Sequence, residues 1–597
     1  MKDLLLGKNV LNGYVDVVIP ESIRSTHMQI IGASGEGKSK FMEYMIRKDI
    51  VYDRGLCLID PHGYLFNDIV KWMTDKGMLD REFPKKLILI DPSNDKWTFG
   101  FNPLKCSDGV EISYHVDAMV KATAKVWGGE DTDKTPLMKR VLRILFHALA
   151  ENNLSLLEAG LMLNPNNRRV REYIASKVHD WIIKEQWEYF NELKGKQFYE
   201  ECGSAINRIL EFLASNDIRN IIGQIENTLD FKTIMDEGYI LLVNLSTSHK
   251  ISDDNARLLG TLIVNDLFLK ARSRKPKSKP FYLYIDECAR FINEDIGRIL
   301  DEGRKFGLHL ILAHQHLAQL RKAGEDIYSA VMTDAKTKVI FGGLSAEDAR
   351  VLAEQVFLGE IDYKESKYER LTVVGHTTRW MKSYSTGRSV TTGVTTSSGR
   401  SSVEASGVHR NESAGDKEGM SRDANGNIIH NSGSDASQGL GRDEMHSDAL
   451  NEMESDMDSN TDTNTEAMSE TLIPILGSEP GAMFSLEEQL DKQMALMVNQ
   501  PQRQAILKLP KRRTIVLRTP DVKGAYATDD EIIEFKEKCF KSKLAAFCQP
   551  KTKVEAGIVE RHRNLIALAN KEDQPLRKIE DFLEEEKINI YVSTKKI

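Results

Sequence analysis

The sequence lacks any uninterrupted apolar run close to the roughly 20 residues that a membrane-spanning helix needs. Its first residues, MKDLLLGKNVLNG, also lack the long apolar stretch of a signal peptide. From these two absences we expect a cytoplasmic protein with no membrane segment of its own.

Cysteine is scarce, and its spacing argues against two kinds of site. The six cysteines form no CxxC pair and no cluster with histidine, so neither a disulfide framework nor a zinc site is predicted. We expect these cysteines to be reduced and structural. An excess of positive charge is missing as well. The formal net charge of -8 argues against a uniformly basic surface for nucleic acid.

What the sequence does contain is an alternation of short apolar runs with helical patterns. The runs are MQIIG (28–32), LCLID (56–60), LILID (87–91), YILLVNL (239–245), FYLYID (281–286), LHLILA (308–313) and KVIFGG (338–343). Such alternation predicts an α/β fold with a parallel sheet and crossover helices. Between residues 104 and 231 the apolar spacing follows the helical period instead, which predicts an inserted, mainly helical subdomain.

Residues 377–471 differ in composition from the rest of the chain. They are rich in Ser, Thr, Gly, Asn and Asp and hold few large apolar side chains. Such a segment buries too little surface to offset its ordering entropy, so we expect a disordered linker, with a regulatory or partner-binding tail as the alternative. The later segments FSLEEQL (484–490) and TIVLRTP (514–520) indicate a return to ordered structure.

The segment GASGEGKS satisfies the phosphate-binding pattern GxxxxGK[ST] between an apolar strand and a helix. Glycines in this setting let backbone N–H groups turn toward phosphates at a helix N-terminus. Lys38 would neutralise the β- and γ-phosphate oxygens, and Ser39 would ligate Mg²⁺. We therefore expect ATP and Mg²⁺ as cofactors. The predicted cradle is Gly32, Ala33, Ser34, Gly35, Glu36, Gly37, Lys38 and Ser39.

A second signal is FYLYIDE, an apolar strand that ends in two carboxylates. After a phosphate cradle, this is the Walker B pattern. Asp286 at the end of the strand is expected to hold Mg²⁺ through water. Glu287, one residue further, is expected to polarise the water that attacks the γ-phosphate. The sequence therefore predicts an ATPase.

Polar residues follow two more of the predicted strands. The run LHLILA ends in His314 and Gln315, and Gln315 is expected to sense the γ-phosphate, with His314 as a packing or supporting residue. LCLID ends in Asp60, which is expected to orient the attacking water or the Mg²⁺ shell, while His62 is read as a cap of the adjoining helix. Ligands of such sheets bind at the carboxyl ends of the strands, where these residues would meet.

Together these residues resemble the HerA/FtsK superfamily of P-loop motors, in particular the branch shared by HerA and the TraG/TraD-like type IV coupling proteins. The matching segments are THMQIIGASGEGKS, IDPHG, GFNPL, IDECARF, EGRKFGLHLILAHQHLAQL, FSLEEQL and RTPDV. The resemblance covers most of residues 1–375 and, more weakly, residues 480–570. It implies a RecA-like P-loop fold with a central, mostly parallel sheet. The five expected segments are 1–104 and 236–375 for the two parts of the ATPase domain, 105–235 for the helical insertion, 376–470 for the linker and 471–597 for a small C-terminal region.

The resemblance also implies a function. A homo-oligomeric ring, most simply a hexamer, would thread DNA through its pore without reading sequence and couple ATP hydrolysis to translocation in conjugation or type IV secretion. A relaxase or a secretion channel would then be the partner. One alternative is a HerA-type helicase or translocase in DNA-end processing or phage defence, with a separate nuclease as partner. Another is a secretion-associated ATPase that acts on protein substrates.

Two basic segments leave alternatives open. Arg304, in EGRKFG, resembles the superfamily's GRK segment and is expected either to reach the ATP of a neighbouring subunit or to fix a helix end by binding carbonyls. The loop 272–279, RSRKPKSK, is either a solvated loop or a contact for DNA phosphates, which need only positive charge.

Overall fold

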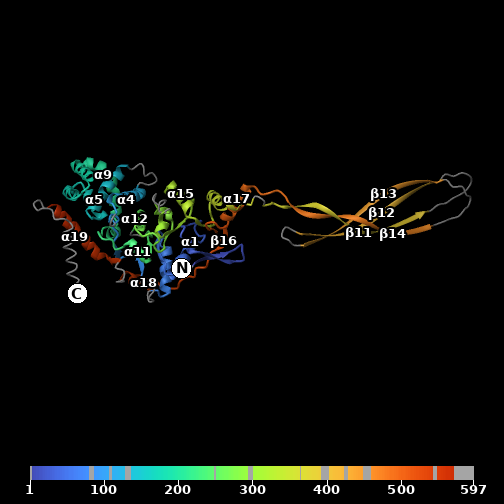
Figure 1. Ribbon diagram of the computed structural model, residues 1–597, viewed down its shortest axis with the longest axis horizontal. Coiled ribbons are helices and arrows are strands. Elements are labelled where there is room, and N and C mark those ends of the chain that lie inside the picture. Colours follow the sequence, from blue (N-terminus) through green and yellow to red (C-terminus); the bar gives the residue numbers. More distant parts are fainter. Residues whose placement is uncertain are drawn as a thin grey trace, which may run out of the picture. The chain divides into compact units, whose positions relative to one another are not determined.

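The computed structural model describes residues 3–78, 86–106, 110–127, 136–247, 251–292, 300, 302–362, 365–391, 403–422, 428–447, 459–541 and 547–570. These residues divide into two compact units. The first contains residues 1–361 and 485–597, and the second contains residues 362–484 (Figure 1). No helix in the described part of the chain is long and apolar enough to cross a membrane.

The first unit is built on an 11-stranded sheet with the order β2-β1-β16-β15-β10-β3-β9-β8-β4-β7-β5. Its seven strands from β10 to β5 are mutually parallel. They are β3 (Met28–Ile31), β4 (Gly55–Asp60), β5 (Leu87–Ile90), β7 (Ile240–Asn244), β8 (Phe281–Ile285), β9 (Leu308–His314) and β10 (Thr337–Phe341). Each corresponds to an apolar run of the sequence. The predicted α/β fold of the RecA-like P-loop type, with its mostly parallel sheet, is confirmed.

Both faces of the parallel strands are buried, which explains why the runs are apolar without alternation. On one face, odd-numbered residues of β4 such as Cys57 pack toward α12 (Asp253–Arg272) and the helical insertion. On the other, even-numbered residues such as Leu58 pack with α2 (Lys38–Val51) and α3 (Tyr64–Asp75). Crossover helices on both faces therefore fix the edge at which every strand presents its carboxyl end.

The insertion between β6 (Trp97–Phe99) and β7 is helical where it is described, as the sequence predicts. Figure 1 draws its helices in cyan to green at one side of the first unit. They are α4 (Ile112–Trp127), α5 (Pro136–Glu151), α6 (Ala159–Met162), α7 (Arg168–Ser176), α8 (Trp181–Glu192), α9 (Gly195–Leu213), α10 (Asn216–Ile222) and α11 (Phe231–Glu237). Trp187 on α8 is fully buried, whereas Trp181 at the start of the same helix is 72% exposed.

The C-terminal part of the chain, from residue 485, groups with the first unit. The strand β15 (Gln504–Lys508) pairs antiparallel with β10, and β16 (Ile515–Arg518) pairs antiparallel with β15. The N-terminal strands β1 (Leu4–Asn9) and β2 (Val15–Ile19) extend it further. The remaining C-terminal helices are α17 (Leu486–Val498), α18 (Asp529–Lys541) and α19 (Lys551–Ala569).

The second unit contains the segment for which we expected a linker. Backbone ladders pair β11 (Glu369–Thr391) with β14 (Ser459–Pro480) and β12 (Val403–Arg422) with β13 (Ile428–Ser447). Its grouping apart from the first unit agrees with a segment outside the ATPase core. This agrees with the linker expected over 376–470, through which the backbone ladders run.

α19 is bound to the helical insertion by a buried carboxylate. Arg561 Nη2 donates to Glu158 Oε1 at 2.8 Å, and His562 Nε2 lies 3.1 Å from the same oxygen. Burial alone would raise the pKa of the Glu158 carboxyl. The hydrogen bond with His562, the charge of Arg561 and the hydroxyl of Ser155 outweigh it and lower the pKa to about 2.

Replacing Glu158 by glutamine should destabilise the protein by about 3 kcal/mol at neutral pH, because it leaves the Arg561 guanidinium without its buried partner. A carboxyl group whose pKa is lower in the folded state than in the unfolded state stabilises the fold at any pH above the unfolded pKa. This stabilisation is lost as the pH falls to the folded pKa. The difference in the free energy of unfolding between wild type and Glu158→Gln should therefore decrease as the pH falls from 4.5 to about 2. Urea unfolding across this range measures it, with the exposed Glu560→Gln of α19 as control. Equal stability of the two proteins at pH 7 would contradict the role of Glu158.

Candidate active site

The phosphate cradle lies at the carboxyl end of β3 and leads directly into α2. Gly37, the residue before α2, has a φ of 111°, a conformation that residues with a side chain rarely adopt. A Cβ atom on Gly32 would lie 2.5 Å from the Cβ atom of Phe341 on the neighbouring strand β10. The loop therefore needs glycine at both positions, and the exposed Ser39 lies in the first turn of α2, where free N–H groups favour anions.

Lys38 binds backbone carbonyl groups of the cradle. Its Nζ donates to the carbonyl oxygens of Gly32 at 2.6 Å and Ala33 at 2.9 Å. Burial lowers the pKa of the Lys38 ammonium, and the charges of Glu287 and Asp286 oppose that effect. Because carbonyls are weaker partners than phosphate oxygens, a bound triphosphate can take over these hydrogen bonds.

The carboxylates of Asp286 and Glu287 follow β8 and are almost fully buried. Burial, together with the charges of Asp60 and Glu287, raises the pKa of Asp286 to about 7. Glu287 has a φ of 45°, an unusual conformation for a residue with a side chain and one found often at active sites. Three buried carboxylates, those of Asp60, Asp286 and Glu287, thus lie near the Lys38 ammonium at this edge of the sheet.

Gln315 lies beside Glu287, as the sequence predicts for strands β8 and β9. Its Nε2 donates to Glu287 Oε1 at 2.6 Å. A second amide, which sequence reasoning missed, belongs to Gln319 on α14 (Leu317–Ala323), whose Nε2 lies 3.3 Å from Glu287 Oε2. The i, i+4 spacing of two glutamines at a strand-to-helix junction was the signal for it. The γ-phosphate sensing role of Gln315 stays a prediction.

Asp60 is engaged by backbone at the same edge of the sheet. Its Oδ1 accepts from the backbone N–H of His62 at 2.9 Å, and its Oδ2 accepts from that of Phe66 at 2.8 Å. Asp60 thus caps α3, the role that the sequence analysis gave to His62. Its charge still raises the pKa of Asp286, and its action on a water or the Mg²⁺ shell stays a prediction.

The C-terminal part of the chain also contacts the cradle, which the sequence analysis did not foresee. Gln502 Nε2 donates to the Gly35 carbonyl at 2.7 Å, and the backbone N–H of Arg503 donates to the Glu36 carbonyl at 3.1 Å. These partners are more than 450 residues apart in the chain, and PQRQ carries no recognisable motif. No feature of the sequence alone could have paired them.

Arg304 lies at the opposite edge of the sheet, in the 3₁₀ turn η4 (Gly303–Phe306) that precedes β9. Its side chain is exposed and makes no hydrogen bond or ion pair with any described residue. The choice between the two roles expected for Arg304 stays a prediction. The site does not bring Arg304 together with Lys38 of the same chain.

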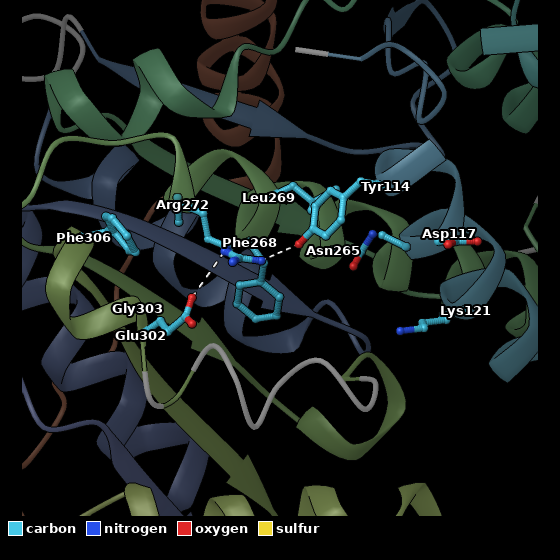
Figure 2. Close-up of a pocket in the computed structure, with 12 residues that line it drawn as sticks. Tyr114, Asp117, Lys121, Asn265, Phe268, Leu269, Arg272, Glu302, Gly303 and Phe306 are labelled. Atoms are coloured by element: carbon cyan, nitrogen blue, oxygen red, sulfur yellow. Dashed lines mark hydrogen bonds and ion pairs between the residues drawn. The ribbon is translucent and has the colours of Figure 1, made fainter. Parts of the chain in front are cut away.

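The basic loop 272–279 lies at this edge too, and part of it is structural. Arg274 is buried, and its guanidinium donates to Asp236 and to the carbonyl oxygens of Phe306 and Lys279. Arg272 binds Glu302 and the Tyr114 hydroxyl beside a cavity of about 140 Å³ between α4, α12 and η4 (Figure 2). Lys275, Lys277 and Lys279 remain exposed. The cavity contains no cradle residue and is separate from the nucleotide edge.

Part of this chain is similar to a known protein family. Residues 280–397, which begin just before β8, match the family model described as the TraM recognition site of TraD and TraG. Over this range the chain is similar to TraD and TraG. The HerA side of the resemblance stays a prediction. No curated protein matches the chain.

Several solved structures resemble this chain. The plasmid coupling protein TrwB in complex with the GTP analogue GDPNP is 14% identical, with 88% of this chain and 97% of that chain covered and a TM-score of 0.47. The bacterial conjugative coupling protein TrwBdeltaN70 is 13% identical, with coverage of 86% and 89% and a TM-score of 0.45. VirB4 of Thermoanaerobacter pseudethanolicus is 13% identical, with coverage of 62% and 92% and a TM-score of 0.37.

Proposed function

We propose that this protein is an ATP-driven DNA translocase of the conjugative coupling type, which works as a homo-oligomeric ring, most simply a hexamer. The observation that carries the ATPase part is the convergence of Lys38, Asp286, Glu287 and Gln315 on one edge of the sheet. In this assignment Lys38 binds the β- and γ-phosphates of ATP. Glu287, held by two glutamine amides, accepts a proton from the attacking water.

The residues at this edge fit Mg²⁺. The hydroxyl of Ser39 and the carboxylate of Asp286 are hard oxygen donors, the kind of ligand that Mg²⁺ prefers. When bound, Mg²⁺ would neutralise phosphate charge. Ser39 and Asp286 would hold it, Asp286 through water.

The match to the TraM recognition site of TraD and TraG favours a coupling role, with a protein partner bound through part of residues 280–397. A relaxase and a secretion channel are the further partners that such a role requires. The alternatives are a HerA-type DNA-end-processing or defence motor, with a nuclease as partner, and an ATPase for protein substrates. The three exposed lysines of the basic loop favour a DNA substrate, which they can contact without reading sequence.

Linear DNA should stimulate ATP hydrolysis several-fold, and the stimulation should fall steeply between 50 and 200 mM salt because phosphate contacts release counterions. Phosphate release with single-stranded and double-stranded DNA measures this effect. Lys275→Glu combined with Lys279→Glu should weaken the stimulation and flatten its salt dependence. Lys511→Glu with Lys523→Glu, exposed lysines elsewhere, is the matched control. A rate that DNA leaves unchanged at every salt concentration would favour protein substrates instead.

A further inference from the structure

Three buried polar side chains lie on adjacent strands behind the cradle. They are Gln29 on β3, His314 on β9 and Lys338 on β10, and none is more than 5% exposed. The parallel register sets Lys338 beside Gln29, and β9 flanks β3 on its other side. Their neighbours on these strands are mostly apolar, so three polar groups here need a reason beyond packing.

The hydrogen bonds between these three side chains have one consistent direction. Lys338 Nζ donates to Gln29 Oε1 at 2.8 Å, which leaves the amide nitrogen of Gln29 to face His314 Nε2 at 3.0 Å. An amide nitrogen can only donate, so His314 Nε2 accepts. His314 Nδ1 then carries the proton and donates to the His316 carbonyl at 3.2 Å. Burial lowers the pKa of His314 to about 3, in agreement with this neutral tautomer.

The chain of hydrogen bonds ends at the turn that carries Gln315. The backbone N–H groups of Gln315 and His316 donate to Gln319 Oε1 at 2.9 and 3.2 Å. The amides of Gln315 and Gln319 in turn donate to the two oxygens of Glu287. The His316 carbonyl, which His314 holds, therefore fixes the turn from which both amides reach the carboxylate.

The other end of this chain of hydrogen bonds, at Lys338, lies at the edge of the sheet opposite the cradle. Lys338 Nζ also donates to the carbonyl oxygens of Met332 at 2.9 Å and Ala335 at 3.3 Å. These carbonyls lie at the end of α15 (Glu325–Asp334) and just before β10. The Lys338 amino group thus has three hydrogen-bond acceptors, although burial lowers its pKa to about 7.

We propose that Lys338, Gln29 and His314 are positioning residues for ATP hydrolysis, which hold the 314–316 turn so that Gln315 and Gln319 bind Glu287. They touch neither nucleotide nor water themselves. The inference rests on the proposed ATPase function and extends it to residues outside the motifs. This positioning role explains why a lysine and a histidine are buried here, since apolar side chains of similar volume could not form these hydrogen bonds.

Gln29→Leu should lower kcat about tenfold and leave the affinity for a fluorescent ATP analogue within twofold of wild type. Gln29→Glu keeps an acceptor for Lys338 but has no proton for His314 Nε2, so it should lower kcat as well. Lys338→Met should behave like Gln29→Leu, and Lys338→Arg should restore much of the rate because it still donates. Thr337→Val is the matched control, since the Thr337 hydroxyl is buried next to Lys338 and has no hydrogen-bond partner in the described part of the chain.

Two further measurements distinguish positioning from a general loss of structure. In a protein that already carries Gln315→Ala and Gln319→Ala, adding Gln29→Leu should cost no further rate, because the turn then has nothing to position. A full tenfold loss in that background would overturn the proposal. So would an unchanged kcat in Gln29→Leu.

The ¹⁵N shifts of the His314 imidazole supply a readout that does not depend on hydrolysis. Wild type should show a proton on Nδ1, and Gln29→Glu should move it to Nε2. A wild-type proton on Nε2 would overturn the hydrogen-bond chain even in an active enzyme. A correct tautomer in a wild-type protein that hydrolyses no ATP would instead contradict the proposed function and leave the hydrogen-bond chain intact.

Discussion

Replacing Glu287 by glutamine should abolish ATP hydrolysis and leave ATP bound. Glutamine has the shape of glutamate, and its single side-chain oxygen can still accept the hydrogen bond from Gln315, whereas the hydrogen bond from Gln319 is lost. What it loses is the basic oxygen that takes a proton from the attacking water. General base catalysis contributes about 10²- to 10⁴-fold, so kcat should fall by that factor.

Phosphate release at saturating ATP measures the rate, and the affinity for the fluorescent ATP analogue measures binding. Glu287→Gln should bind nucleotide within a few-fold of wild type and retain it, whereas Lys38→Ala should bind poorly because the charge opposite the phosphates is gone. Glu347→Gln, an exposed carboxylate on α16 (Ala346–Phe357), is the control and should turn over normally. Wild-type turnover in Glu287→Gln would show that another group activates the water.

The parts of this site that the sequence predicted are those encoded locally. The cradle, the carboxylates after β8 and Gln315 after β9 each follow a short apolar run, and parallel strands bring such positions to a common edge. The strand runs themselves were readable because a sheet covered on both faces is apolar throughout. For these residues the local sequence pattern is therefore enough to predict their position in the fold.

The parts that the sequence did not predict depend on contacts across the chain. Gln502 and Arg503 reach the cradle only because β15 joins the sheet beside β10. The five-residue sequence of β15 does not show that this strand extends a parallel sheet in the antiparallel direction. The capping role of Asp60 depends on how tightly α3 follows β4. Lys338 and Gln29 were visible as polar residues inside apolar runs, but their partnership required the strand order.

Replacing Arg304 by alanine should lower ATP hydrolysis by about 10³-fold through a neighbouring subunit rather than through its own. Arg304 precedes β9, whereas the nucleotide edge lies beyond the other end of that seven-residue strand. At about 3.3 Å per residue the separation is about 20 Å, which is too far for an arginine side chain to span. An exposed guanidinium free of partners among the described residues is instead available to the next copy in a ring, where it would stabilise charge on the γ-phosphoryl group.

Mixing two inactive proteins tests this directly. Arg304→Ala subunits keep an intact cradle, and Lys38→Ala subunits keep an intact arginine, so each should be nearly inactive alone. A mixed ring contains interfaces at which a working cradle meets a working Arg304, and activity should return in proportion to their number. Lys305→Ala, in the same turn and also exposed, is the matched control and should hydrolyse ATP normally. If mixed rings form and recover no activity, or if Arg304→Ala alone keeps the wild-type rate within a ring, Arg304 does not act on a neighbour's ATP.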